Sequence, residues 1–186
     1  MSAEKSGKTT TVEAMLGLLS GGPLSGYEIK KRIGESIGNF WSESFGQIYP
    51  TLKRMVAEGL AKVEDDQGTG GRERKRYRLT DAGRNRLGEW LTLPAMDQVP
   101  RNELLLKLFF GNRAERDDMK KLVETKKAEL SADLKRFEAI EARIAATYAG
   151  HPGLPYWLMT VRYGKAEAVG LIAWCDDCLG TFKEML

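Results

Sequence analysis

The sequence contains few of the residues from which disulfide frameworks and metal sites are built. It has two cysteines and one histidine among 186 residues. Cys175 and Cys178 are three positions apart, which cannot supply the disulfide framework of a small secreted domain. A structural zinc ion needs four ligands, and His151 stands alone in a predicted turn, far from the cysteines along the chain. These shortages favour a reducing, cytoplasmic compartment and predict neither a metal nor another cofactor.

Long apolar runs and catalytic motifs are absent as well. No stretch approaches the roughly 20 apolar residues that span a bilayer. Val12 to Leu19 resembles the core of a signal peptide, but Glu13 interrupts it and no cleavage site follows. The sequence holds no glycine-rich phosphate loop, catalytic triad or paired-carboxylate cleft. We therefore expect neither a membrane protein nor an enzyme.

The net charge of +3 is small, but its distribution is uneven. Residues 1–92 carry 15 Lys and Arg against 12 Asp and Glu, whereas residues 93–186 carry 14 of each. Within the first half, residues 72–86 hold seven basic residues against two acidic ones. This cluster predicts a phosphate-binding patch.

The periodicity of the first half predicts three helices, a hairpin and a fourth helix. Ser25 with Glu28, and Ser44 with Gln47, have the spacing of capping boxes. Alternating residues after Leu60 indicate strands on either side of a glycine-rich turn. The expected helices cover residues 9–19, 25–37, 44–58 and 81–91, and the strands cover 60–65 and 72–79. This order predicts a winged helix-turn-helix domain over residues 1–92, in a chain that is mainly α with a two-stranded β-wing.

The second half reads as a linker, 93–100, followed by a helical dimerisation and effector domain, 101–186. A helix is expected over 101–110, a long one over 113–148, and a last one from Pro155 to the C-terminus. The long helix has an apolar stripe that a single chain is too small to cover, which predicts a homodimer. The expected dimerisation residues are Met119, Leu122, Leu130, Leu134, Phe137, Ile140, Ile144, Leu171 and Trp174.

The helix over 44–58 divides into two faces at about 100° per residue. Ile48, Leu52 and Met55 fall on the side expected to be buried, and Pro50 predicts a local irregularity. In a helix-turn-helix the second helix of the motif enters the major groove, so the opposite side predicts DNA contacts. The expected DNA-binding residues are Gln47, Tyr49, Lys53 and Arg54 on this helix, with Arg72, Arg74, Lys75 and Arg76 on the wing. The alternative is an ordinary solvated helix and hairpin.

Four segments carry a resemblance to the PadR family of transcriptional regulators. They are Leu24-Ser25-Gly26-Tyr27-Glu28-Ile29, Gly46-Gln47-Ile48-Tyr49-Pro50-Thr51-Leu52, Glu58-Gly59-Leu60 and Tyr77-Arg78-Leu79-Thr80-Asp81-Ala82-Gly83-Arg84. Tyr163-Gly164 and Trp174 resemble the longer C-terminal domain of one branch of that family. The resemblance implies a homodimer that represses by binding a roughly palindromic operator in double-stranded DNA and leaves it when a small effector binds. Relatives often have proline where this chain has Phe45, so the start of the recognition helix is expected to differ.

Other interpretations stay open at this point. Trp90, Trp157 and Trp174 are weak candidates for an effector site, although core packing explains aromatic residues at helical spacing equally well. A winged-helix protein that binds other proteins rather than DNA is the main alternative, and a thiol-based redox sensor using Cys175 and Cys178 is a remote one. An adaptor has no use for the basic residues of the predicted wing.

Overall fold

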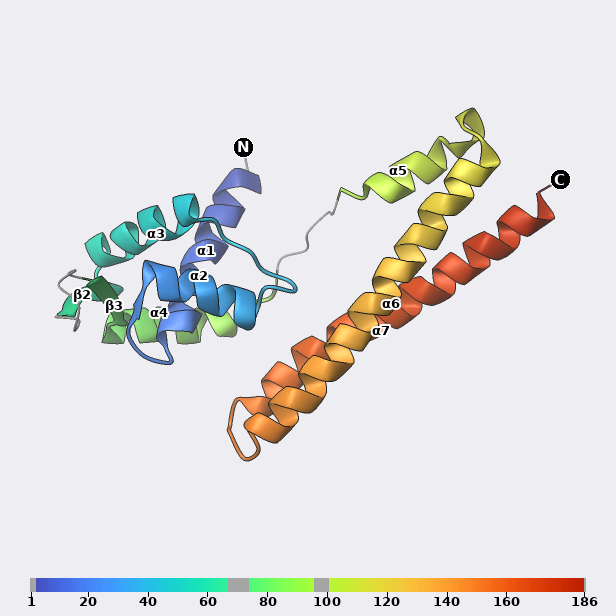
Figure 1. Ribbon diagram of the computed structural model, residues 1–186. Helices are drawn as coiled ribbons and strands as arrows, with labels where there is room; N and C mark the ends of the chain where they lie inside the picture. Colours follow the sequence, from blue (N-terminus) through green and yellow to red (C-terminus); the bar gives the residue numbers. More distant parts are fainter. Residues whose placement is uncertain (1–2, 67–73, 96–100, 186) are drawn as a thin grey trace. The chain divides into compact units, whose positions relative to one another are not determined.

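The computed structural model describes residues 3–66, 74–95 and 101–185, and residues 3–9 only in their backbone. The chain divides into two compact units, Met1–Asp97 and Gln98–Leu186, which are considered separately (Figure 1). The turn expected at residues 67–71 and most of the expected linker lie outside the described residues. In the part of the chain that is described, no helix has the length and apolar character to cross a membrane.

The first unit consists of four helices and a small antiparallel sheet. In chain order its elements are α1 (Ala3–Leu19), β1 (Leu24–Ser25), α2 (Gly26–Glu35), α3 (Phe45–Ala57), β2 (Ala61–Asp66), β3 (Arg74–Leu79) and α4 (Asp81–Leu91). The strand order is β1-β3-β2, and Tyr77 in the central strand pairs with Leu24 on one side and Val63 on the other. The expected fold class is confirmed, except that the sheet has three strands. β1 has only two residues, too few for an alternating pattern to be visible.

The core of this unit lies where α1, α2 and α3 meet. Val12, Met15 and Leu16 on α1 are fully buried and pack with Ile29 on α2 and Leu52 on α3. The helices thus bury the apolar faces that their 3.6-residue periodicity predicts. This burial is the main source of the unit's stability.

Local capping signals set most of the boundaries. Ser25 and Glu28 form the expected capping box, and the Thr80 hydroxyl accepts a hydrogen bond from Gly83 N at 3.1 Å. Gly59 ends α3 with φ of 71°, a backbone conformation that favours glycine. One expectation was wrong, since α1 begins at Ala3 rather than Thr9; α3 continues through Pro50 as a single helix. Pro50 removes a single backbone donor, and the other hydrogen bonds maintain the helix.

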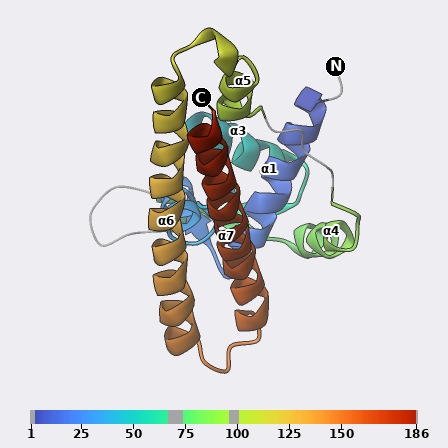
Figure 2. The ribbon, with the colours of Figure 1, turned by 90° about the vertical axis from the view of Figure 1, so that its right-hand side faces the viewer.

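The second unit is a long helical hairpin preceded by a short helix. Its elements are α5 (Glu103–Phe109), a 3₁₀ turn (Gly111–Arg113), α6 (Arg116–Thr147) and α7 (Leu154–Glu184). α6 starts three residues later than expected because the 3₁₀ turn occupies Gly111–Arg113. α6 and α7 lie side by side and antiparallel (Figure 2). Their buried core contains Val123 and Leu130 from α6 and Cys175 from α7.

Ion pairs and one close approach align the two long helices. Glu141 Oε1 accepts a hydrogen bond from Arg162 Nε, and its Oε2 accepts one from Lys165 Nζ, both at 2.7 Å. These contacts hold the Glu141 pKa below its ordinary value, the Lys165 bond being the larger cause. A Cβ at Gly164 would lie 2.7 Å from the Phe137 ring, so this glycine lets α6 and α7 pack closely.

We predict that Gly83→Ala destabilises the first unit. An added Cβ would overlap the Leu60 carbonyl oxygen and lie 2.6 Å from Leu79 Cδ1, so α4 would have to move. Overpacking of this kind costs about 1–3 kcal/mol in the free energy of unfolding. Gly88→Ala on the same helix is the matched control, since nothing lies within 4 Å of its Cβ position. It should stabilise by about 0.5–1 kcal/mol. Urea unfolding measures both, and equal effects of the two substitutions would contradict the packing described.

Candidate nucleic-acid interface

The residues of α3 separate into a buried face and an exposed face as the helical periodicity predicts. Ile48, Leu52 and Met55 are completely buried. Gln47, Tyr49, Lys53 and Arg54 are all exposed. The apolar side of α3 therefore faces the core, and the opposite side of the helix presents its polar residues to solvent.

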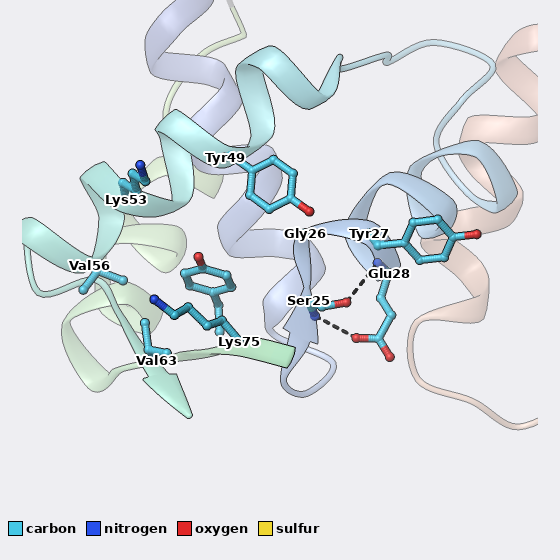
Figure 3. Close-up of a pocket in the computed structure, with 10 residues that line it drawn as sticks. Ser25, Gly26, Tyr27, Glu28, Tyr49, Lys53, Val56, Val63 and Lys75 are labelled. Atoms are coloured by element: carbon cyan, nitrogen blue, oxygen red, sulfur yellow. Dashed lines mark hydrogen bonds between the residues drawn. The ribbon is translucent and has the colours of Figure 1, made fainter. Parts of the chain in front are cut away.

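A groove of about 700 Å³ runs along the exposed side of α3. Its walls are the start of α2, the middle of α3 and the two wing strands β2 and β3 (Figure 3). The lining residues are Ser25, Gly26, Tyr27, Glu28, Tyr49, Lys53, Val56, Val63, Lys75 and Tyr77. The fold therefore brings three of the expected DNA-binding residues, Tyr49, Lys53 and Lys75, to a single groove.

Tyr49 lines the groove and packs on α2. A Cβ at Gly26 would lie 2.6 Å from Tyr49 Cε1, so the ring lies directly against the backbone of α2. Phe45, one turn earlier, stacks on Tyr49 with a centroid distance of 6.1 Å. Burial raises the pKa of the Tyr77 phenol above its ordinary value, and nearby Tyr49 adds to the shift, so Tyr77 stays neutral at physiological pH. The contact with Gly26 was not predicted, because it joins segments 23 positions apart with no local signal.

Several arginines that appear as an uncompensated cluster in the sequence form ion pairs. Arg78 Nε donates to Glu64 Oε1 at 2.5 Å, which lowers the pKa of Glu64. Arg84 pairs with Asp81, and Arg86 donates to buried Glu13 at 3.0 Å. The excess of positive charge on the surface is therefore smaller than the sequence count indicates.

The expected DNA-binding cations differ in what they contact. Arg76 donates to the Pro23 carbonyl at 2.8 Å and lies 3.6 Å from Glu28, so it helps to hold β1 and α2 against β3. Arg54 lies 3.8 Å from Glu58, one turn along α3. Lys53 and Lys75 are exposed and form no ion pair with the residues that the structure describes. Arg72 and the side chain of Arg74 lie outside the described residues.

A buried glutamate fixes the entry to α3. Glu43 is 3% exposed, and its Oε1 accepts hydrogen bonds from Thr11 Oγ1 at 2.7 Å and from Trp41 Nε1 at 3.1 Å. Its backbone carbonyl accepts a bond from Lys30 Nζ at 2.6 Å. The segment before α3 is thus attached to both α1 and α2. This role could not be predicted from the sequence, because a glutamate before a helix is ordinarily solvated.

The tryptophans expected to contact an effector lie on different elements, and two of them, Trp157 and Trp174, are far apart on one helix. Trp90 lies on α4 of the first unit and is 36% exposed. Trp157 stacks on His151, with ring centroids 4.7 Å apart, at the start of α7. Trp174 packs near Cys175, about 25 Å further along the same helix at ~1.5 Å per residue. A small molecule cannot touch both Trp157 and Trp174 within one chain.

The two cysteines lie in the packing between α6 and α7. Cys175 is fully buried and Cys178 partly so. Burial raises the pKa of both thiols, which disfavours the reactive thiolate form. Among the described residues, no group of three or more potential ligands could hold a metal ion. The geometry favours a packing role for these cysteines.

The expected dimerisation residues differ in how far they are buried. Leu130 is buried between α6 and α7, and Val123, which was not expected, is buried beside it. Leu171 is 37% exposed on α7. The partly buried members are Met119, Leu122, Leu134, Phe137, Ile140, Ile144 and Trp174. α7 therefore covers part of the stripe that we expected a second chain to cover.

The helices α1 to α3 with the adjoining β-wing define a winged helix-turn-helix, here followed by a helical hairpin. The family profile of the "Transcriptional regulator PadR-like family" matches residues 15–89, and that of the "Virulence activator alpha C-term" matches residues 100–183. The negative transcriptional regulator PadR of Bacillus subtilis (strain 168) is 32% identical over 172 residues, covering 89% of this chain and 93% of that protein. The chain belongs to the PadR-like family of transcriptional regulators.

Solved structures agree with this assignment. The crystal structure of Bacillus subtilis PadR in complex with operator DNA has a TM-score of 0.83 and 26% identity, covering 92% of this chain and 96% of that one. The structure of the same protein in complex with p-coumaric acid has a TM-score of 0.77 and 25% identity, covering 95% and 97%. The similarity therefore extends over both units.

We predict that Gly26→Ala displaces the Tyr49 ring from α2 and lowers the free energy of unfolding by about 1 kcal/mol, because the new methyl group overlaps the ring, which is 44% exposed and can move outward. Tyr49→Ala should cost less in the Gly26→Ala background than in the wild type, since the clash is then absent. A double-mutant cycle by urea unfolding measures this coupling. Strictly additive effects would contradict the contact.

Proposed function

We propose that this protein is a transcriptional repressor that binds double-stranded operator DNA as a homodimer through α3 and the wing, and releases it when a small effector binds. The observation that carries the proposal is the groove in which Tyr49, Lys53 and Lys75 meet beside the exposed face of α3. The relative crystallised with operator DNA supports it.

The chemistry of each side chain suits a distinct part of the DNA. Lys53 and Lys75 come from α3 and from β3, so together they can neutralise phosphates on the two sides of a major groove occupied by α3. The Tyr49 hydroxyl can donate to a phosphate oxygen. Gln47 and Arg54 lie on the other flank of the exposed face, where base edges are within reach. Arg72, Arg74 and Arg76 stay predictions as further phosphate contacts.

Replacing Lys53 or Lys75 with Ala should weaken DNA binding for all sequences. Each loss should reduce the slope of log affinity against log salt by about 0.9, since one phosphate fewer releases its counterion. Lys120→Ala is the control, because this lysine is on α6 and pairs with Glu124. Fluorescence titrations against the gene's own upstream duplex at several salt concentrations measure the slopes. Unchanged slopes in both variants would remove Lys53 and Lys75 from the interface.

The homodimer is proposed because the second unit leaves many large apolar side chains exposed. On α5 and the residue after it these are Leu105, Leu106, Phe109 and Phe110, and on α7 they are Tyr156, Trp157, Met159, Tyr163, Val169 and Leu171. A surface of this kind is typical of an interface. A twofold dimer would also present two copies of α3 to a roughly palindromic site, about one helical turn of DNA apart.

The substitution Phe109→Asp should convert the dimer to a monomer or weaken it severely, because the ring is 80% exposed in one chain and a buried charge would oppose association. The isolated chain should keep its helical content, since the ring contributes little to the packing of its own unit. Light scattering at micromolar concentration and circular dichroism measure the two quantities. A wild-type monomer would exclude the dimer, and an unchanged dimer in the variant would exclude α5 from the interface.

Release by an effector rests on the relative crystallised with p-coumaric acid and on the tryptophans of this chain. A flat aromatic acid can stack on an exposed indole, and Trp90 and Trp157 are both partly exposed. The positions of Trp157 and Trp174 on α7 make them alternatives rather than two walls of one site. Repression, rather than activation, follows the negative regulator of Bacillus subtilis to which the chain is similar.

A further inference from the structure

The two ends of the Gln47 amide differ: its oxygen accepts hydrogen bonds within the protein, and its nitrogen forms none with the described residues. Gln47 is the third residue of α3, and it is exposed. Its Oε1 accepts one hydrogen bond from the Ser44 backbone N–H at 3.0 Å and a second from Ser44 Oγ at 3.1 Å. A backbone N–H can only donate, so the atom it meets must be the amide oxygen. The backbone therefore fixes which way the Gln47 amide is turned.

The consequence is that Gln47 presents donors alone to solvent. An amide oxygen has two lone pairs, and both are engaged by Ser44. The Nε2 group has two N–H donors and forms no hydrogen bond with the described residues. In the first turn of a recognition helix, these two donors lie where base edges are contacted.

We infer that Gln47 recognises a keto oxygen in the major groove, O6 of guanine or O4 of thymine. The inference rests on the proposed function, since it requires α3 to occupy the groove. The usual pairing of glutamine with adenine needs the amide oxygen to accept from the adenine amino group. Here that oxygen is already engaged, and the amino groups of adenine and cytosine would meet another amino group.

The energies favour keeping the oxygen on Ser44. Turning the amide oxygen towards the adenine amino group would require both bonds from Ser44 to break. It would leave the Ser44 backbone N–H without the partner that the capping box supplies. The donor-only arrangement is therefore the one that meets the DNA.

Gln47→Glu separates recognition from helix capping. Glutamate is the ordinary partner in a capping box, so it still accepts from Ser44 N–H. Its second oxygen replaces the Nε2 donors with an acceptor. The substitution thus keeps the start of α3 and reverses the hydrogen-bonding character of the outward atom. Gln47→Ala is the second variant, since it removes both the cap and the contact.

The experiment is selection from a duplex library with a randomised core, followed by titration of duplexes that differ at one base pair. Wild type should prefer guanine or thymine at one position in each half-site, by about fivefold, the effect of one hydrogen bond. Gln47→Glu should prefer adenine or cytosine there and unfold at the wild-type temperature. Gln47→Ala should show no preference there and unfold at a lower temperature. With wild type, a base analogue that lacks only the keto oxygen should lose the same fivefold.

Three outcomes overturn the inference. The first is a preference that Gln47→Glu leaves unchanged, which would mean that another residue recognises the base. The second is a wild-type preference for adenine that Gln47→Ala abolishes, which would mean that the amide oxygen faces the DNA. The third is full binding of the analogue without the keto oxygen. If wild type enriches no duplex and binds with no salt dependence, the proposed function itself fails, and this result differs from all three.

Discussion

The burial of one side of α3 is the constraint on which the rest of the first unit depends. Ile48, Leu52 and Met55 are held without any exposed surface against α1 and α2. A rotation of the helix about its axis would bring these side chains into water and lose several kcal/mol, since each is worth about 1.5–3 kcal/mol when buried. The direction in which Gln47 and Lys53 point is therefore set by the core rather than by their own contacts.

The fold also decides which charges are available to a partner. Between Lys75 and Arg86, most arginines contact a carboxylate or a carbonyl of the same unit, as Arg78 does with Glu64 and Arg76 with Pro23. Lys75, in the same strand as those two arginines, lies at the groove instead. Arginine makes several directed hydrogen bonds and lysine acts as a point charge on a flexible stem, which suits these separate tasks. Counting charges along the sequence cannot separate the two groups, because the partners come from distant segments.

Features determined by neighbouring residues could be predicted from the sequence, and features determined by distant residues could not. The caps at Ser25 and Thr80, the faces of α3 and the two long strands follow from spacings of two to four residues. The contact of Tyr49 with Gly26, the burial of Glu43 and the pairing of Leu24 with Tyr77 join positions far apart in the chain. The extent to which α7 covers α6 is of the same kind. Periodicity identified the apolar stripe on α6 but carries no information about which chain packs on it.

In the recognition proposed above, capping and base contact use the same side chain at the start of α3, which would link stability to specificity. The oxygen of Gln47 completes the hydrogen bonding of Ser44, and the remaining donors face outward. A glutamine is the residue that can do both, since serine or asparagine is too short to reach back from this position and glutamate offers only acceptors. The neighbouring Glu43 attaches the same segment to α1 through Thr11. The position of the recognising atoms is therefore determined from the core outward, through Glu43, Ser44 and Gln47 in turn. A base contact built in this way would be rigid, which would allow a single hydrogen bond to distinguish one base edge from another.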